Sequence, residues 1–97
     1  MINAEVEKSK PKFPNPFVEH REIFFQGYST AERLCQLVMH LWNSSYELDL
    51  SRFLANADAD HVKIAIECMQ WYAHYRENDR DFMALANELR DNFYTKD

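Results

Sequence analysis

Helix-breaking residues are missing from most of this chain of 97 residues. The only glycine is Gly27, and no proline follows Pro16. Beyond these positions apolar residues recur every three or four places, and Ser, Asp and Asn residues that can cap a helix stand between the apolar segments. Successive strands need tight turns, which depend heavily on glycine and proline. The sequence therefore predicts an all-α fold, a compact bundle of four to five short helices.

The most apolar of the predicted helices covers residues 59–76. It has two apolar stripes at helical spacing. One stripe comprises Val62, Ala65, Ile66, Met69, Tyr72 and Ala73, and the other comprises Ile64, Cys68, Trp71 and Tyr75. Because both stripes need cover, we expect this hydrophobic helix to lie at the centre of the bundle or between two subunits.

The segment 16–26 allows two interpretations. Asn15 can cap a helix that begins at Pro16, and Gly27 can follow its last residue. Phe17, His20, Phe24 and Ile23 would then face inward. The same segment has the composition of a strand, but no second strand is visible to pair with it. We therefore favour the helix.

Three further helices are expected over residues 30–43, 50–56 and 79–94. Their proposed caps, together with that of the helix over 59–76, are Ser29 with Glu32 at capping-box spacing, Asp49, Asp58 and Asn78. The apolar stripe of the final helix comprises Phe82, Leu85, Ala86, Leu89 and Phe93. Short connections between these helices favour a bundle in which neighbours pack side by side.

The chain divides into a tail and one domain. Residues 1–12 are polar and alternate in charge, so we expect a flexible tail, whereas residues 13–97 form a single helical domain. No secretory signal is visible, and no apolar run approaches the roughly 20 residues that cross a membrane. We expect a cytoplasmic protein that does not bind membranes, with Cys35 and Cys68 as reduced core residues.

The net charge of −5 limits the class of partner. The basic cluster of the chain, Lys8, Lys10 and Lys12, lies in the tail, and the rest of the surface would repel a phosphate backbone. Direct nucleic-acid binding is therefore not expected.

No pattern supports a catalytic, cofactor or metal site. Neither Cys-x-x-Cys nor His-x-x-x-His occurs, and one glycine cannot build a phosphate-binding loop. Asp58 stands three positions before His61, but Asp58 is the expected helix cap, so we interpret His61 as a first-turn surface residue. The conceivable nucleophilic pair is Cys35 with His40 or His74, and a core thiol is the commoner role for such a cysteine. We expect no enzymatic activity, no cofactor and no metal.

Large aromatic residues are unusually dense for so short a chain. Tyrosine and tryptophan are enriched at subunit interfaces, where one end of the ring is packed and the other is wet. The candidate interface residues are Trp42, Tyr46, Trp71, Tyr72, His74 and Tyr75. The alternative is an ordinary core role, which we favour for Trp42 and Trp71.

The middle of the chain also carries three short motifs. A helix ends at Trp42-Asn43, a short helix starts at Asp49-Leu50, and a long alanine-containing helix follows. In these motifs the chain resembles a group of small uncharacterised helical proteins from proteobacterial mobile elements. This resemblance covers about residues 34–70. It implies that the protein is bacterial, and it assigns no activity to any residue.

Two classes of function remain. The first is a helical interaction module whose protein partner is itself, as a homodimer. The alternative is an acidic inhibitor, encoded by a mobile element, that occupies a nucleic-acid-binding host protein. Its acidic face would comprise Glu67, Glu77, Asp79, Asp81, Glu88 and Asp91. Basic residues are mixed among these carboxylates, which favours the interaction module.

Overall fold

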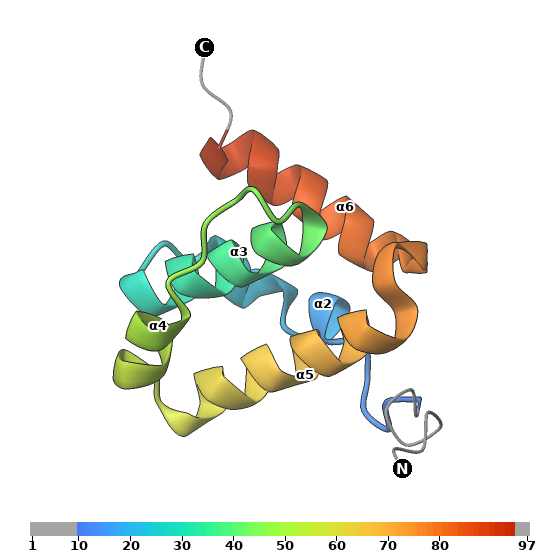
Figure 1. Cartoon of the computed structure of the whole chain (residues 1–97), viewed down its shortest axis with the longest axis horizontal. Helices are drawn as coiled ribbons and strands as arrows, with labels where there is room; N and C mark the ends of the chain where they lie inside the picture. Colours follow the sequence, from blue (N-terminus) through green and yellow to red (C-terminus); the bar gives the residue numbers. More distant parts are fainter. Residues whose placement is uncertain (1–9, 95–97) are drawn as a thin grey trace.

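The computed structural model describes residues 10–94, and this part of the chain is helical without any strand (Figure 1). Its elements are α2 (Pro16–Glu19), η1 (Arg21–Phe25), α3 (Ser29–Trp42), α4 (Leu50–Asn56), α5 (Ala59–Tyr75), η2 (Arg76–Asn78), α6 (Arg80–Leu89) and η3 (Arg90–Tyr94). The predicted all-α bundle is confirmed. Most of the predicted tail, residues 1–9, and the last three residues, 95–97, lie outside the described residues.

The segment 16–26 is helical, as favoured, but it is not one helix. Asn15 caps α2 by accepting a hydrogen bond of 2.9 Å from the backbone N–H of Phe17. The chain leaves the α-helical conformation at His20, which has φ −110° and ψ 21°, and continues as the 3₁₀ helix η1. This break places the His20 ring 3.2 Å from the Glu67 carboxylate on α5, while Phe24 enters the core.

Gly27 provides the turn between η1 and α3. Its φ of +86° lies in the left-handed region, which glycine adopts without steric cost. The predicted capping box at Ser29 is wrong, because α3 already begins at Ser29 and Tyr28 is the N-cap residue. Tyr28 makes no side-chain capping bond, since its phenol is directed elsewhere.

The caps of α4 and α5 are those expected from the sequence. Asp49 accepts from the backbone N–H of Arg52 at 3.2 Å, and Asp58 accepts from that of His61 at 3.0 Å. These bonds satisfy backbone groups that have no partner within the helix.

The final helix differs from the expectation at both ends. Its N-cap is Asp79 and not Asn78, because the Asp79 carboxylate accepts from the backbone N–H of Asp81 at 3.0 Å. The α-helix ends at Leu89 and gives way to the π-helical turn η3. A π-turn holds more residues than an α-turn, so Phe93 leaves the buried stripe and is 47% exposed.

The core lies around α3. In Figure 1, α3 runs between α5 on one side of the molecule and α6 on the other, and it contacts both, together with η1 and α4. Six residues of α3 are buried: Ala31, Leu34, Cys35, Leu37, Val38 and Met39. Only three residues of the longer α5 are buried: Ile64, Ala65 and Cys68. The helix predicted to be covered on most of its circumference is therefore covered on one side.

Candidate functional site

The opposite side of α5 presents apolar residues to solvent. We call Ala59, Val62, Ile66, Met69 and Ala73 the outer α5 face. Ile66 is 44% exposed and Met69 36% exposed, although both belong to a stripe that the sequence suggests should be covered. The neighbouring positions Ile64 and Cys68 point into the core. The first predicted stripe is therefore divided, because its Ala65 is buried in the core while Ile66, Met69 and Ala73 stay exposed.

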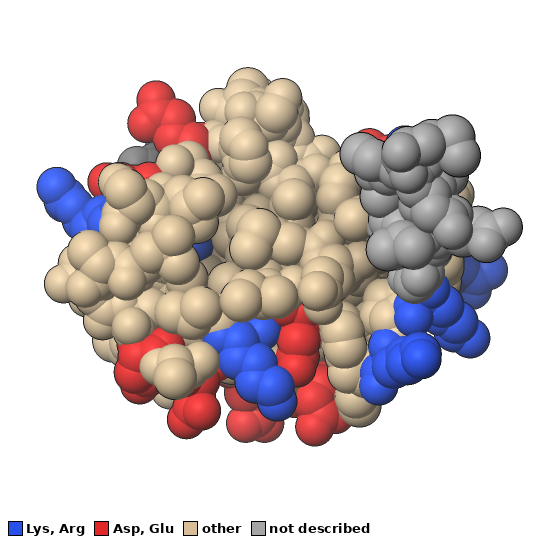
Figure 2. Space-filling model, turned by 60° about the horizontal axis from the view of Figure 1, so that its bottom comes forward, with Lys and Arg blue, Asp and Glu red and all other residues tan. Residues whose placement is uncertain are grey.

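Three residues of the outer α5 face, Ala59, Val62 and Ile66, line a shallow and mostly apolar groove. Phe13, from the extended segment before α2, and Ala57 add to its apolar lining, and Lys63, Glu67 and Gln70 add polar groups. Figure 2, which brings the α5 side of Figure 1 forward, shows a broad surface without Lys, Arg, Asp or Glu, with charged side chains mainly along its lower edge and at its sides. An apolar area rimmed by polar groups is typical of an interaction surface.

The spacing along this face is that of a coiled-coil seam. Positions 59, 62, 66, 69 and 73 follow one another at alternating steps of three and four residues, which is the a/d pattern of a heptad repeat. Such a seam packs against a second helix. In the described part of the chain, α2 and α3 contact α5, but they bury the other side of it.

Four of the six candidate aromatic and histidine residues lie near the C-terminal end of α5. The Trp71 indole N–H donates to the Asp79 carboxylate at 2.6 Å, and its ring contacts that of Tyr75 at 4.6 Å. His74 and Tyr75 meet edge to face at 4.5 Å, and Tyr72 packs on Phe82. These four side chains are half-buried, and Asp79 anchors Trp71 to the start of α6.

The other two candidates, Trp42 and Tyr46, lie at and just after the C-terminal end of α3. Trp42 and Tyr46 pack with ring centroids 5.9 Å apart, and Tyr46 meets Tyr94 edge to face at 5.2 Å. The guanidinium of Arg90 lies over the Trp42 ring at 5.5 Å. Both Trp42 and Tyr46 pack against the core, as Trp71 and Tyr72 do. Trp42 and Tyr72 also line one shallow pocket, so the two groups of candidates meet there.

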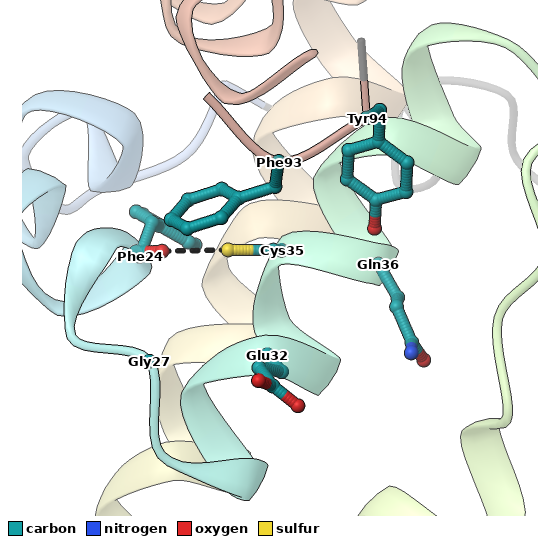
Figure 3. A pocket seen from close by; sticks show the side chains of 7 residues that line it. All are labelled: Phe24, Gly27, Glu32, Cys35, Gln36, Phe93 and Tyr94. Atoms are coloured by element: carbon teal, nitrogen blue, oxygen red, sulfur yellow. Dashed lines mark hydrogen bonds between the residues drawn. The ribbon is translucent and has the colours of Figure 1, made fainter. Parts of the chain in front are cut away.

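A cavity of about 280 Å³ lies between η1, α3 and the C-terminal turn (Figure 3). Its lining comprises Phe24, Gly27, Glu32, Cys35, Gln36, Phe93 and Tyr94. In Figure 3 the Phe24 and Phe93 rings lie on the side of the Cys35 thiol, and the Tyr94 hydroxyl points toward Gln36. No histidine lines this cavity, so the structure does not bring Cys35 together with either of its conceivable bases there.

The thiols are not poised to react. Cys35 donates a hydrogen bond to the carbonyl oxygen of Phe24 at 2.6 Å, and burial raises the pKa of its thiol to about 12. Burial also raises the pKa of Cys68. Because the thiolate is the nucleophilic form, neither cysteine acts as a nucleophile near neutral pH. His40 follows Cys35 by five positions on α3, and its Nδ1 makes a hydrogen bond of 2.8 Å with the carbonyl oxygen of Tyr46.

A second group of polar side chains meets where α3 and α5 begin. His61 lies 2.7 Å from Asp58 through Nδ1 and 2.7 Å from the Tyr28 hydroxyl through Nε2. His61 is in the first turn of α5, as expected, but its side chain is only 16% exposed. The sequence analysis did not include Tyr28 in any site. The sequence does place His61 three positions after the capping Asp58. This spacing indicates the Asp58–His61 contact but not the one with Tyr28.

The carboxylates of the proposed acidic face are mostly occupied by local partners. Glu67 meets His20 and Lys63, and Asp79 accepts from Trp71. Two further pairs are Glu88 with Arg21 and Asp91 with Arg90. Four of the six carboxylates therefore hold the fold together or are neutralised on the surface.

Residues 10–94 contain neither a metal-binding cluster nor a membrane-spanning helix. No group of three or more His, Cys, Asp or Glu side chains in this range is arranged to hold a metal ion. Within the same range, none of the helices combines the length and the apolar character needed to cross a membrane.

The contacts described above define the candidate site. Comparison of the sequence with known protein families, of the chain with curated proteins, and of the fold with solved structures finds no match in any of the three.

Proposed function

We propose that this chain is a small non-enzymatic interaction module that forms a homodimer through the outer α5 face. The observation that carries this proposal is the exposure of Ile66 and Met69 within a heptad-spaced seam. An a/d seam gains stability when a second helix covers it, because each apolar side chain then enters a hole formed by its neighbours. The two buried free cysteines fit a reducing cytoplasm as the place where this occurs.

The pattern of the face favours a second copy as the partner. Two identical helices that cross antiparallel about Ile66 would place Ile66 against its own counterpart and Val62 against Met69 of the second copy. Ala59 would then meet Ala73, so the small residues at both ends allow close approach of the helices. A two-fold interface requires this kind of self-complementarity. One helix per subunit is a small contact area, so we expect a dimer with a dissociation constant in the micromolar range.

Light scattering across a concentration series, at low and high salt, tests the proposal. We expect a mass that rises toward that of a dimer with protein concentration and changes little with salt, because the seam is apolar. Ile66→Glu should keep the protein monomeric at every concentration. Val18→Glu is the matched control, since Val18 is an exposed apolar residue of α2 outside the outer α5 face. A monomeric wild type, or equal effects of the two variants, contradicts the proposal.

Cross-linking tests the geometry separately. In the antiparallel arrangement Ile66→Cys lies at the two-fold axis and should form a disulfide-linked dimer under mild oxidation, because its counterpart is opposite. Met69→Cys should cross-link poorly alone and well when mixed with Val62→Cys. In a parallel pair each position would face itself, so Met69→Cys would cross-link well alone. Ile66→Cys would cross-link in either arrangement, and the Met69→Cys result therefore decides between them.

The acidic inhibitor is the weaker proposal. Of its six carboxylates, Glu67, Asp79, Glu88 and Asp91 already have partners within the chain. A basic host protein would have to compete with these contacts. Binding of this kind would weaken steeply as salt rises, which distinguishes it from the apolar dimer in the same light-scattering experiment.

A further inference from the structure

Three side chains form a continuous hydrogen-bonded chain at the start of α5. The carboxylate of Asp58 lies 2.7 Å from Nδ1 of His61, and Nε2 of His61 lies 2.7 Å from the hydroxyl oxygen of Tyr28. Both distances are at the short end for their type. The three residues come from two segments, because Tyr28 and His61 are 33 positions apart in the sequence.

The carboxylate decides which ring nitrogen carries the proton. A carboxylate only accepts, so Nδ1 of neutral His61 must be the donor toward Asp58. The lone pair of Nε2 then faces Tyr28, whose hydroxyl donates to it. The hydrogen bond to His61 also holds the pKa of Asp58 below its ordinary value, so the carboxylate stays charged at neutral pH.

The helix cap holds this geometry in place. The same oxygen of Asp58 that contacts the His61 ring also accepts from the His61 backbone N–H at 3.0 Å. The ring of His61 meets that of Tyr28 edge to face, with centroids 5.7 Å apart and planes at 84°. Capping, ring contact and burial of His61 therefore restrict the imidazole to one orientation.

The phenol at the end of the chain is open to solvent. Tyr28 is 45% exposed and sits in the turn after Gly27, outside the packed core. A nucleophile within hydrogen-bond reach of a base, with that base oriented by a third group, is the arrangement that activates hydroxyl nucleophiles in covalent chemistry. Nothing in the proposed dimer uses these three residues.

We propose that Tyr28 is an acceptor site for an acyl group supplied by an activated ester, with His61 as the general base and Asp58 as its positioning residue. The phenol oxygen attacks the ester carbonyl while its proton moves to Nε2 of His61. A bond forms between Oη of Tyr28 and the acyl carbon, and the bond from that carbon to the leaving oxygen breaks. The leaving alcohol departs as its anion and takes up a proton from His61 or from water.

Incubation of the intact protein with p-nitrophenyl acetate tests this assignment. We expect release of about one equivalent of p-nitrophenolate per chain in a fast phase. Peptide mapping by mass spectrometry should place one acetyl group on Tyr28, and Tyr28→Phe should lose both the fast phase and that label. An acetyl group on His61 in place of Tyr28 would overturn the proposal, because the imidazole would then be the nucleophile.

Two variants that keep Tyr28 itself test the base and its positioning residue. His61→Gln should slow acetylation of Tyr28 by about 100-fold, which is the lower range for loss of a general base. Asp58→Asn should slow it by about tenfold, since asparagine caps a helix as well as aspartate does but carries no charge. If both variants are acetylated at the wild-type rate, the three residues make a structural contact only and the proposal is wrong. Circular dichroism of each variant verifies that α5 is intact.

Discussion

Helices α3 and α5 are both rich in apolar residues, yet the molecule uses them differently. Helix α3 is contacted by η1, α4, α5 and α6, and its apolar residues are buried almost throughout. Helix α5 is three residues longer, but α2 and α3 cover only one side of it. The position of a helix in a bundle therefore depends on how many elements can reach it, and an apolar circumference by itself does not make a helix central.

The largest expected effect comes from a substitution in the buried helix, α3. Leu34 on α3 is fully buried, and Leu34→Ala should lower the free energy of unfolding by about 2–5 kcal/mol through lost transfer energy and a residual cavity. Ile66→Ala on α5 should cost less than about 0.5 kcal/mol in the monomer. Urea denaturation at low protein concentration measures both. Equal losses would mean that Ile66 is covered within one chain.

A smaller effect concerns the C-terminal end of α5. Oδ2 of Asp79 accepts from both the Trp71 indole at 2.6 Å and the Asn15 amide at 2.9 Å. Asp79→Asn would preserve an N-cap oxygen but would direct an NH₂ group at these two donors. We expect a loss of about 1 kcal/mol in the free energy of unfolding, because two half-buried donors lose their acceptor.

The control for this prediction is a cap without tertiary partners. Within residues 10–94 the Asp49 side chain accepts from Ser51 and Arg52 of its own helix alone, so Asp49→Asn should leave the free energy of unfolding almost unchanged. If the two asparagine variants behave alike, Asp79 acts as a helix cap only and does not anchor α5.

The smallest effect concerns the surface that covers α3. Arg21 of η1 pairs with Glu88 of α6, and this hydrogen-bonded pair holds the pKa of Glu88 below its ordinary value of 4.5. A carboxylate with a lowered native pKa stabilises the fold above the unfolded-state pKa, and this contribution disappears as the pH falls through the native pKa. Both groups are exposed, so the contribution is weak and screened by salt.

Glu88→Gln should therefore reduce stability slightly at pH 7 and leave it unchanged at a pH well below the ordinary carboxyl range. Urea midpoints of the wild type and variant, compared at the two pH values and at two salt concentrations, measure the difference. A gap that persists in acid would show that the glutamine variant disturbs packing and does not report on charge.

Much of the fold followed from local sequence, because helix caps are local devices. Asn15, Asp49 and Asp58 each cap the helix expected of them. The expected cap at Asn78 was one residue off, because Asn78 and its neighbour Asp79 are both good caps and contacts from distant Trp71 and Asn15 select Asp79. The π-turn that exposes Phe93 has no comparable local marker.

The candidate sites were harder to predict, since they depend on contacts between distant segments. Ile66 and Met69 were recognised as apolar stripe residues, but which stripe stays open is decided by where α2 and α3 pack. The pairing of Tyr28, just before α3, with His61, in the first turn of α5, joins side chains that are 33 positions apart. Neither residue alone signals that meeting.

Cys35 and Cys68 can report on how α5 moves. Cys68 lies on the covered side of α5 and is fully buried, whereas Cys35 on α3 lines the pocket of Figure 3 and is 5% exposed. An alkylating reagent can reach the Cys68 sulfur only when α5 opens, so its rate of modification reports that opening equilibrium. Cys35 should react faster, because less of the structure has to move. Dimerisation through the outer α5 face should therefore slow the modification of Cys68 and leave that of Cys35 unchanged.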